Sequence, residues 1–391
     1  EGLTGASVFC DCVSIFPERL TLAFIKSAVA YGAKISNYTK VEGFLMDSKK
    51  NIKGVRVKDL LRNKICEVAG DVTVNCGGPW ADIVLGMAKP KENGDTTLRR
   101  SEGIHIITAK RLLSGDYTVG SMTPAGRHFF LIPWRNHTLI GTTDKPFTGN
   151  PDDYHVTKES IMELIEDVNS SFGDGKLSYA DVQHTYGGLR PLVEKETKET
   201  YSSSRKYEIY DNKYEGLDGL ITVEGGKYTT SRKLAENCLK IVATKMGRSL
   251  GESITEKHYL AGCEIKDLTD FLSQVQKENS DFNKSTMDYL GRHYGTEYAE
   301  VIKLAHVDKA LAETLNEDGE IMAEVVYAVR NEMARTLSDI VMRRTGIGTL
   351  GNPGEDILRK VAQVAAKELQ WDQNRIEKEI ADTINLLKLP V

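Results

Sequence analysis

The chain has 391 residues, of which 40% are hydrophobic and 27% charged, and its formal net charge is −5. This length predicts two or three domains, because one hydrophobic core rarely extends beyond about 250–300 residues. The composition is typical of a soluble globular protein, and an acidic balance without a run of Lys or Arg argues against a nucleic-acid partner. No apolar stretch approaches the roughly 20 residues that span a bilayer, and we find no signal peptide.

The first third of the chain alternates strand and helix patterns. An apolar run over 8–15 predicts a strand, and Pro17 opens an amphipathic helix that ends at Gly32. The apolar strand 72–75 ends at Cys76-Gly77-Gly78-Pro79, where a further helix should begin. Four short strands are expected between them, over 33–38, 40–47, 52–59 and 64–69.

The remainder predicts a strand-rich layer and then a helical tail. After Cys263, Leu, Ala, Glu and Lys recur at helical spacing to the C-terminus. The fold class is therefore α/β plus α+β, with a C-terminal all-helical domain. Before Cys263 we expect helices over 157–171 and from Thr229 or Thr230 to about Met246, and strands over 103–108, 129–134, 138–142, 178–187, 206–210 and 220–224.

The segment around Gly225-Gly226-Lys227 is the most informative. An apolar strand runs into two glycines and then into a helix N-terminus, where unpaired N–H groups carry a partial positive charge. Lys227 adds an ammonium to the same turn, which suits an anionic substrate or an electron-rich cofactor edge. An ordinary strand–helix connection is the alternative.

The cysteine pattern favours reduced thiols over disulfides. There is a C-x-C at Cys10 and Cys12 but no C-x-x-C, and most cysteines lie in apolar patterns, which predicts buried, reduced thiols in the cytoplasm. No further ligands follow Cys10 and Cys12 at the usual spacing, so no metal site is expected.

Several segments together resemble the flavin-dependent glycerol-3-phosphate dehydrogenases, within the D-amino-acid-oxidase-like flavoproteins. They occur in the family's order over nearly the whole chain. The segments are V-N-C-G-G-P-W-A (74–81), S-E-G-I-H-I (101–106), F-F-L-I-P-W (129–134), I-G-T-T-D (140–144), Y-G-G-L-R-P-L (186–192), S-R-K-Y-E-I (204–209), E-G-G-K-Y-T-T-S-R-K-L-A-E (224–236) and R-T-L-S-D-I-V-M-R-R-T (335–345).

This resemblance implies a partial FAD-binding α/β domain, a strand-rich substrate domain and a C-terminal helical domain. The family opens with a βαβ unit whose G-x-G-x-x-G turn holds the FAD pyrophosphate. The match begins downstream of that unit, and the chain begins with Glu1, so we expect an N-terminally truncated fragment. The expected segments are 1–15 (substrate-layer strand), 16–98 (FAD domain), 99–189 (substrate domain), 190–258 (FAD domain) and 259–391 (helical domain).

A G-x-G-x-x-G does occur at Gly346, Gly348 and Gly351, but its context differs from that of a dinucleotide site. The preceding residues 323–344 predict a helix, whereas a dinucleotide-binding turn follows a strand. The C-terminal turn of a helix is the better interpretation.

The resemblance also implies the substrate-binding residues. Arg190 suits a phosphate because a guanidinium binds phosphate oxygens bidentately; an ion pair with Glu194 is the alternative. Lys227 is expected as a phosphate ligand or as a charge beside the flavin pyrimidine, and Arg205 as a third cation. His105, Arg190 and Lys227 are the expected catalytic residues. The other seven histidines are expected to be structural or surface residues.

His105 is expected in the active site, as the base that accepts the substrate's hydroxyl proton or as a substrate ligand. A histidine packed on a strand without a chemical role is the alternative. The expected FAD-contacting residues are Gly77, Gly78, Pro79, Gly225, Gly226, Lys227, Tyr228 and Thr229. The family usually has Ala-Thr-Gly where this chain has Cys76-Gly77-Gly78, which removes a hydroxyl from this segment.

The function implied is oxidation of sn-glycerol 3-phosphate to dihydroxyacetone phosphate by hydride transfer to FAD, with a quinone as electron acceptor. Two alternatives stay open: an oxidase that uses O₂, and a catalytically incomplete fragment without enzymatic activity. The expected location is the cytoplasm, with peripheral contact to the inner face of the membrane, and association into a homo-oligomer is a further expectation.

Overall fold

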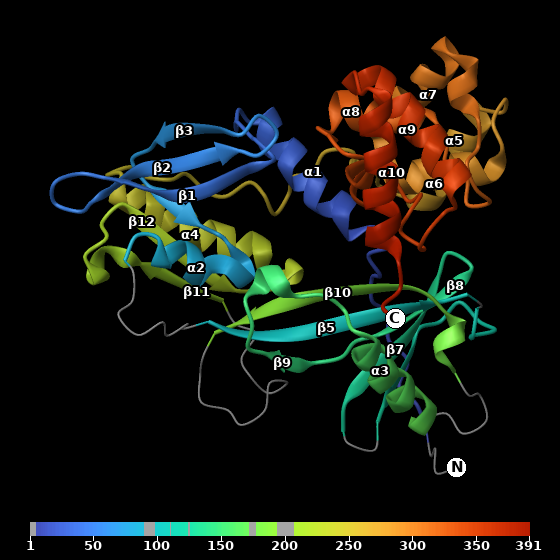
Figure 1. The fold of residues 1–391 in the computed structure, drawn as a ribbon, viewed down its shortest axis with the longest axis horizontal. Coiled ribbons are helices and arrows are strands. Elements are labelled where there is room, and N and C mark those ends of the chain that lie inside the picture. Colours follow the sequence, from blue (N-terminus) through green and yellow to red (C-terminus); the bar gives the residue numbers. More distant parts are fainter. Residues whose placement is uncertain (1–4, 90–97, 110, 124–125, 172–176, 194–206) are drawn as a thin grey trace. The chain divides into compact units, whose positions relative to one another are not determined.

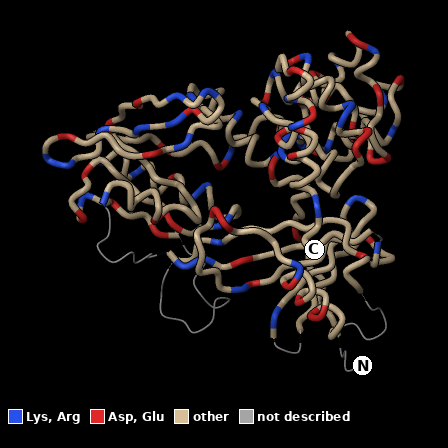
Figure 2. Tube along the Cα trace, viewed as in Figure 1, with Lys and Arg blue, Asp and Glu red and all other residues tan. Residues whose placement is uncertain are grey.

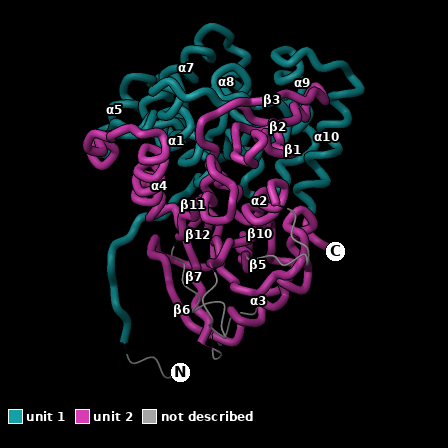
Figure 3. The backbone as a smooth tube through the Cα atoms, turned by 90° about the vertical axis from the view of Figure 1, so that its left-hand side faces the viewer, with its two compact units in different colours: residues 1–35, 259–388 teal, residues 36–258, 389–391 magenta. Residues whose placement is uncertain are grey.

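The chain divides into two units, and each takes residues from separate parts of the sequence (Figure 3). One unit consists of residues 1–35 and 259–388, and the other of residues 36–258 and 389–391. The structure is a computed structural model, and it describes residues 5–89, 98–109, 111–123, 126–171, 177–193 and 207–391. The five segments expected from the sequence are a finer division, which stays a prediction.

Three sheets form the unit of residues 36–258 (Figure 1). The first is the antiparallel meander β1 (Thr39–Met46), β2 (Ile52–Asp59) and β3 (Lys64–Ala69). The second has the order β11 (Tyr207–Asp211), β12 (Leu220–Gly225) and β4 (Thr73–Asn75), with β12 and β4 parallel. The third has the order β10 (Val182–Leu192), β5 (Arg99–Thr108), β8 (His137–Gly141), β7 (His128–Trp134) and β6 (Val119–Met122), with β9 (Lys145–Phe147) paired to β5.

The third sheet is covered on one face by helix α3 (Lys158–Ser171). Ile104 and Ile106 of β5 are fully buried in one core cluster with Ile161 and Leu164 of the helix. Because successive side chains of a strand point to opposite faces, residues 101, 103 and 105 lie on the face away from α3. This second face carries the candidate site.

Helix α4 (Ser231–Lys245) packs on the small mixed sheet of β11, β12 and β4. Ile221 and Val223 of β12 share a core cluster with Cys238 of this helix. Leu220, on the other face of β12, packs with Ile52 of β2. Alternate side chains of β12 therefore pack into two apolar layers, one on each face of the strand. The turn after Gly225 leads directly to the start of α4.

The other described α-helices of nine or more residues belong to the unit of residues 1–35 and 259–388, whereas the shorter α2 (Ala81–Gly86) belongs to the other unit. They form two adjoining apolar clusters, one within residues 315–380 and one within residues 275–327. They are α1 (Pro17–Ala30), α5 (Leu268–Glu278), α6 (Lys284–Tyr294), α7 (Tyr298–Val307), α8 (Ala323–Asn331), α9 (Glu355–Leu369) and α10 (Gln373–Leu387).

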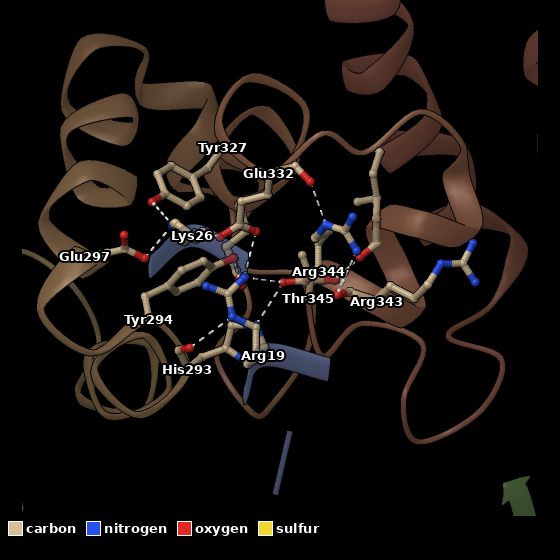
Figure 4. Close-up of polar contacts among 12 residues, drawn as sticks. Arg19, Lys26, His293, Tyr294, Glu297, Tyr327, Glu332, Arg343, Arg344 and Thr345 are labelled. Atoms are coloured by element: carbon tan, nitrogen blue, oxygen red, sulfur yellow. Dashed lines mark hydrogen bonds and ion pairs between the residues drawn. The ribbon is translucent and has the colours of Figure 1, made fainter. Parts of the chain in front are cut away.

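Helix α1 is tied into this helical unit by buried charges (Figure 4). Arg19 donates to Glu332 at 2.6 Å, and the Glu332 side chain is completely buried. Lys26 donates to Glu297 at 2.5 Å and lies 3.5 Å from the other oxygen of Glu332. Tyr294 lies beneath the Arg19 guanidinium, which is 4.5 Å from its ring centroid. Helix α1 is thus part of the core formed by the C-terminal helices, although more than 200 residues separate it from them in the sequence.

Most expected elements are confirmed, and two expected strands are wrong. Residues 5–14 and 33–36 contain no strand, because an apolar pattern does not by itself provide the partner that a strand needs for its backbone hydrogen bonds. The expected helix 323–344 is also interrupted: α8 ends at Asn331, and a π-helical segment, Asp339–Arg344, follows after a break.

The glycine turn 346–351 follows that π-helical segment and precedes α9. This agrees with the interpretation that it is not a dinucleotide-binding turn, because no strand leads into it. The six cysteines are all free thiols, as expected, but only Cys238 is buried, so the expectation that most are buried is wrong.

Charges of both signs are interspersed along the described parts of each unit (Figure 2). Among the described residues, no group of three or more His, Cys, Asp or Glu side chains is arranged to hold a metal ion. None of the described helices combines the length and apolar character needed to cross a membrane.

Candidate functional site

The face of the large sheet opposite α3 places His105 and Arg190 on neighbouring strands. In the antiparallel pairing of β5 with β10, His105 lies opposite Tyr186, and Ser101 opposite Arg190. Residues directly opposite each other point to the same face of a sheet. His105 and Arg190 therefore project from the same face, four residue positions apart along the ladder.

Glycines make room for both side chains. A Cβ atom at Gly103 would collide with the Arg190 guanidinium, and one at Gly141 of β8 would collide with the His105 ring. Gly141 lies directly opposite His105 in the ladder, so the imidazole lies flat across the neighbouring strand. The two glycines thus set the side-chain positions on this face.

Oxygen atoms of four neighbouring residues contact the guanidinium of Arg190. Nη1 donates to the carbonyl oxygens of Glu102 (3.2 Å) and Thr143 (3.1 Å), and Nη2 donates to Oγ1 of Thr142 (2.7 Å). The carboxylate of Asp144 is farther away, at 3.5 Å from Nη1. These contacts orient the guanidinium on this face of the sheet.

His105 is neutral at pH 7 in this environment. Burial, together with the positive charge of Arg190, lowers its pKa to about 4. A neutral imidazole can accept a proton, whereas an imidazolium cannot. The pair therefore combines a fixed cation with a proton acceptor on one surface.

Arg100 links this sheet to the segment Gly77–Gly78–Pro79. Its Nε donates to the carbonyl oxygen of Pro79 at 2.7 Å, and Nη2 contacts Asp82 at 2.5 Å, where both side chains are almost completely buried. Trp80 adds a second connection, from its indole N–H to Asp152 at 2.8 Å. The long strand β10 also contacts both β12 and the short turn Gly78–Trp80.

The Gly225-Gly226-Lys227 turn forms as the sequence predicted. Gly225 and Gly226 have φ values of 74° and 97°, which favour glycine. A short 3₁₀ turn, Tyr228–Thr230, precedes α4, and Lys227 donates its backbone N–H to Oγ1 of Thr230 at 3.2 Å. The expected cap by a threonine is modified accordingly: Thr230 occupies the N-cap position, but its hydroxyl binds Lys227 instead of the helix N–H groups.

The structure brings some of the expected site residues together, and for others it shows no shared position. His105 and Arg190 share one face, and the segments 77–79 and 225–229 follow the parallel strands β4 and β12. That Lys227 joins His105 and Arg190 around one substrate stays a prediction. Arg205 and Glu194 lie outside the described residues.

Sequence reasoning missed three residues that shape the site. Thr142 and Asp144 belong to the matched I-G-T-T-D segment, and Arg100 directly precedes the matched S-E-G-I-H-I segment. The only available signal was polar side chains next to buried strands, without an indication of which strand each would contact.

The two parallel strand ends fit part of an FAD site. Ligands of α/β folds bind outside the carboxyl ends of parallel strands, and both glycine segments lie there. The positive φ values at Gly78, Gly225 and Gly226 allow the backbone turns that a close-lying dinucleotide requires. The described residues thus fit the flavin-contacting part of such a site.

Comparisons with known proteins agree with this arrangement. The family described as FAD dependent oxidoreductase matches residues 1–217, and the family described as C-terminal domain of alpha-glycerophosphate oxidase matches residues 253–376. Glycerol-3-phosphate dehydrogenase of Synechocystis sp. is 30% identical over 97% of this chain and 70% of that protein. Glycerol-3-phosphate dehydrogenase 2 of Mycobacterium tuberculosis is 30% identical over 98% of the chain and 64% of that protein.

A solved structure shows the same fold. The glycerol-3-phosphate dehydrogenase from Bacillus halodurans, complexed with FAD, superposes with a TM-score of 0.81 at 27% identity. The match covers 95% of this chain and 72% of that structure. The chain spans 64–70% of the length of the two curated relatives. By family match and by fold, this chain belongs to the FAD-dependent glycerol-3-phosphate dehydrogenase family.

Proposed function

We propose that this chain carries the substrate-binding sheet of an enzyme that oxidises sn-glycerol 3-phosphate to dihydroxyacetone phosphate. The observation that carries the proposal is the placement of Arg190 and His105 on one sheet face, with a guanidinium four ladder positions from a neutral imidazole. The guanidinium can bind the phosphate, and the imidazole can accept the proton of the secondary alcohol.

In this proposal Arg190 binds the substrate phosphate and His105 accepts the hydroxyl proton at a ring nitrogen. Lys227 adds a second cation from the turn after β12. Gly77, Gly78 and Pro79, together with residues 225–229, would hold FAD, which when bound supplies the hydride acceptor for this oxidation. Glycines at these turns bring the backbone close to the cofactor, and Arg100 keeps the Gly77–Pro79 segment next to β5.

A quinone is the proposed electron acceptor, with contact to the membrane surface as a consequence. The names of the curated relatives support a dehydrogenase, whereas the name of the family matched by residues 253–376 refers to an oxidase. O₂ is therefore the competing acceptor, and the two differ in their product, because only the oxidase releases H₂O₂.

The test begins with the full chain, purified and incubated with FAD. We expect bound flavin to lose its absorbance in the visible range when glycerol 3-phosphate is added without oxygen, and to recover it with a soluble quinone. Formation of stoichiometric H₂O₂ in air would instead assign the oxidase. A chain that retains no flavin would contradict the proposed activity for these 391 residues.

Replacement of Arg190 tests the phosphate site directly. Arg190→Ala removes charge-assisted hydrogen bonds worth about 1.5–3 kcal/mol, so the affinity for glycerol 3-phosphate should fall about ten- to a hundredfold. Isothermal titration calorimetry measures this fall without requiring turnover. The exposed cation Lys145, which pairs with Glu163, provides the control Lys145→Ala, which should leave the affinity unchanged. An equal loss in both variants would remove Arg190 from the phosphate site.

A further inference from the structure

The segment that follows β8 surrounds the Arg190 guanidinium. Thr142 accepts from Nη2, the carbonyl of Thr143 accepts from Nη1, and Asp144 lies beside the same Nη1. Three consecutive residues thus contact one side chain that originates two strands away, on β10. The Arg190 side chain reaches across β5 to make these contacts, because β5 lies between β10 and β8 in the sheet.

The segment is itself fixed to β5. The hydroxyl of Ser101 donates a short hydrogen bond to Oδ1 of Asp144, and the backbone N–H of Ile104 donates to Oγ1 of Thr143 at 3.0 Å. The Asp144 side chain is only 10% exposed. A buried carboxylate held by a neutral hydroxyl and a distant cation has a definite position and little freedom to move.

An arginine needs such support because its side chain carries about 2 kcal/mol of rotamer entropy. The Arg190 side chain is 27% exposed, and Oδ1 of Asp144 lies 3.5 Å from its Nη1. These contacts therefore support the guanidinium in one orientation.

We propose that Asp144 is a positioning residue that holds the Arg190 guanidinium in the orientation in which it receives the phosphate of the substrate. Ser101 anchors the carboxylate, and the anchored carboxylate limits rotation of the guanidinium. The phosphate is part of the function proposed above, and the inference rests on it to that extent. The geometrical role can be tested separately.

The decisive variants are Asp144→Ala and Asp144→Asn. Loss of a negative charge beside Arg190 should by electrostatics alone tighten the binding of an anion in both variants. Positioning gives a different result. Asp144→Ala removes the acceptor and should weaken binding of glycerol 3-phosphate about tenfold, whereas Asp144→Asn retains an Oδ1 acceptor and should stay within about threefold of the native chain.

A double-mutant cycle separates positioning from a general loss of structure. In an Arg190→Lys background there is no guanidinium to orient, so Asp144→Ala should cause no further loss of affinity. Ser101→Ala should reproduce the effect of Asp144→Ala in smaller measure. Glu163→Ala is the matched control, since this exposed carboxylate also accepts from a cation, Lys145, in the same unit. Unchanged or tighter binding in Asp144→Ala would overturn the proposal, as would an equal loss in the Arg190→Lys background.

A measurement without ligand distinguishes this inference from the proposed function. In ¹⁵N-arginine-labelled chain, rotation of the Arg190 guanidinium about its Nε–Cζ bond should be slow and should accelerate in Asp144→Ala. If the native chain does not bind glycerol 3-phosphate but the rotation accelerates, the substrate assignment fails and the positioning role stands. If the substrate binds and the rotation is unaffected, the positioning role fails alone.

Discussion

His184, which is buried, and His105, which is half-buried, lie on the same sheet face and differ in what lowers their pKa. Burial lowers the pKa of His184 to about 4, and burial also lowers that of His105 to about 4, but in His105 the charge of Arg190 contributes as well. Neither ring nitrogen of His184 has a hydrogen-bond partner among the described residues. His184 is therefore an internal control for the electrostatic effect of Arg190.

Replacement of Arg190 should change only one of these histidines. In Arg190→Met the positive charge is lost, so the pKa of His105 should rise above 4 but stay below 6.5, because burial is the larger cause and remains, while that of His184 should stay near 4. Titration of the histidine ring protons by NMR measures both in one sample. A parallel rise in both would mean that the replacement opened the sheet to water instead of removing a field.

Both histidines also couple stability to pH. An unfolded histidine binds a proton below about pH 6.5, whereas these two bind it only near pH 4, so the unfolded state carries more protons between these values. The free energy of unfolding should therefore decrease as the pH falls from 6.5 to 4. Chemical denaturation across this range should show a shallower decrease in His184→Met, and an identical slope would exclude His184 as a contributor.

At the scale of the strand, Gly103 and Gly188 form a matched pair. They lie directly opposite each other on β5 and β10, but a Cβ at Gly103 would meet the Arg190 guanidinium, and one at Gly188 would meet nothing within 4 Å. Gly103→Ala should destabilise the fold by about 1–3 kcal/mol and displace Arg190. Gly188→Ala should be neutral or slightly stabilising, because alanine reduces the freedom of the unfolded chain. Urea denaturation compares the two, and equal effects would contradict the assigned role of Gly103.

The elements show where sequence reasoning succeeds. The alternation in β5 and the glycines at the end of β12 are local signals, so the strand and the tight turn at Gly225 and Gly226 could be predicted. The contacts of Thr142 and Asp144 with Arg190 were not, because they depend on the order of three strands in a sheet. The strand expected over 8–15 failed for a related reason, since a pattern of side chains does not identify a pairing partner.

The whole molecule depends on contacts that no local pattern indicates. Helix α1 has the pattern of an amphipathic helix, but nothing in residues 17–30 shows that it packs with helices that begin after residue 267. The ion pairs of Arg19 and Lys26 with Glu332 show this packing (Figure 4).

Neutralising Glu332 tests this connection. Glu332→Gln would leave the buried guanidinium of Arg19 without its carboxylate, which should destabilise the helical unit by about 3–5 kcal/mol. Thermal unfolding followed by circular dichroism measures the effect. The exposed pair of Arg359 and Glu377 provides the comparison, and Glu377→Gln should change the unfolding temperature little. A small effect in both would show that α1 is held by its apolar contacts.

The wide separation of these partners has a consequence for synthesis on the ribosome. Lys26 emerges 271 residues before Glu297, and Arg19 emerges 313 residues before Glu332. At about 5–20 residues per second, α1 is in the cell for roughly 15–60 s before the helices that bury it exist. During that interval its apolar side is open to chaperones and to other nascent chains, so the helical unit can be completed only after Glu332 has been translated.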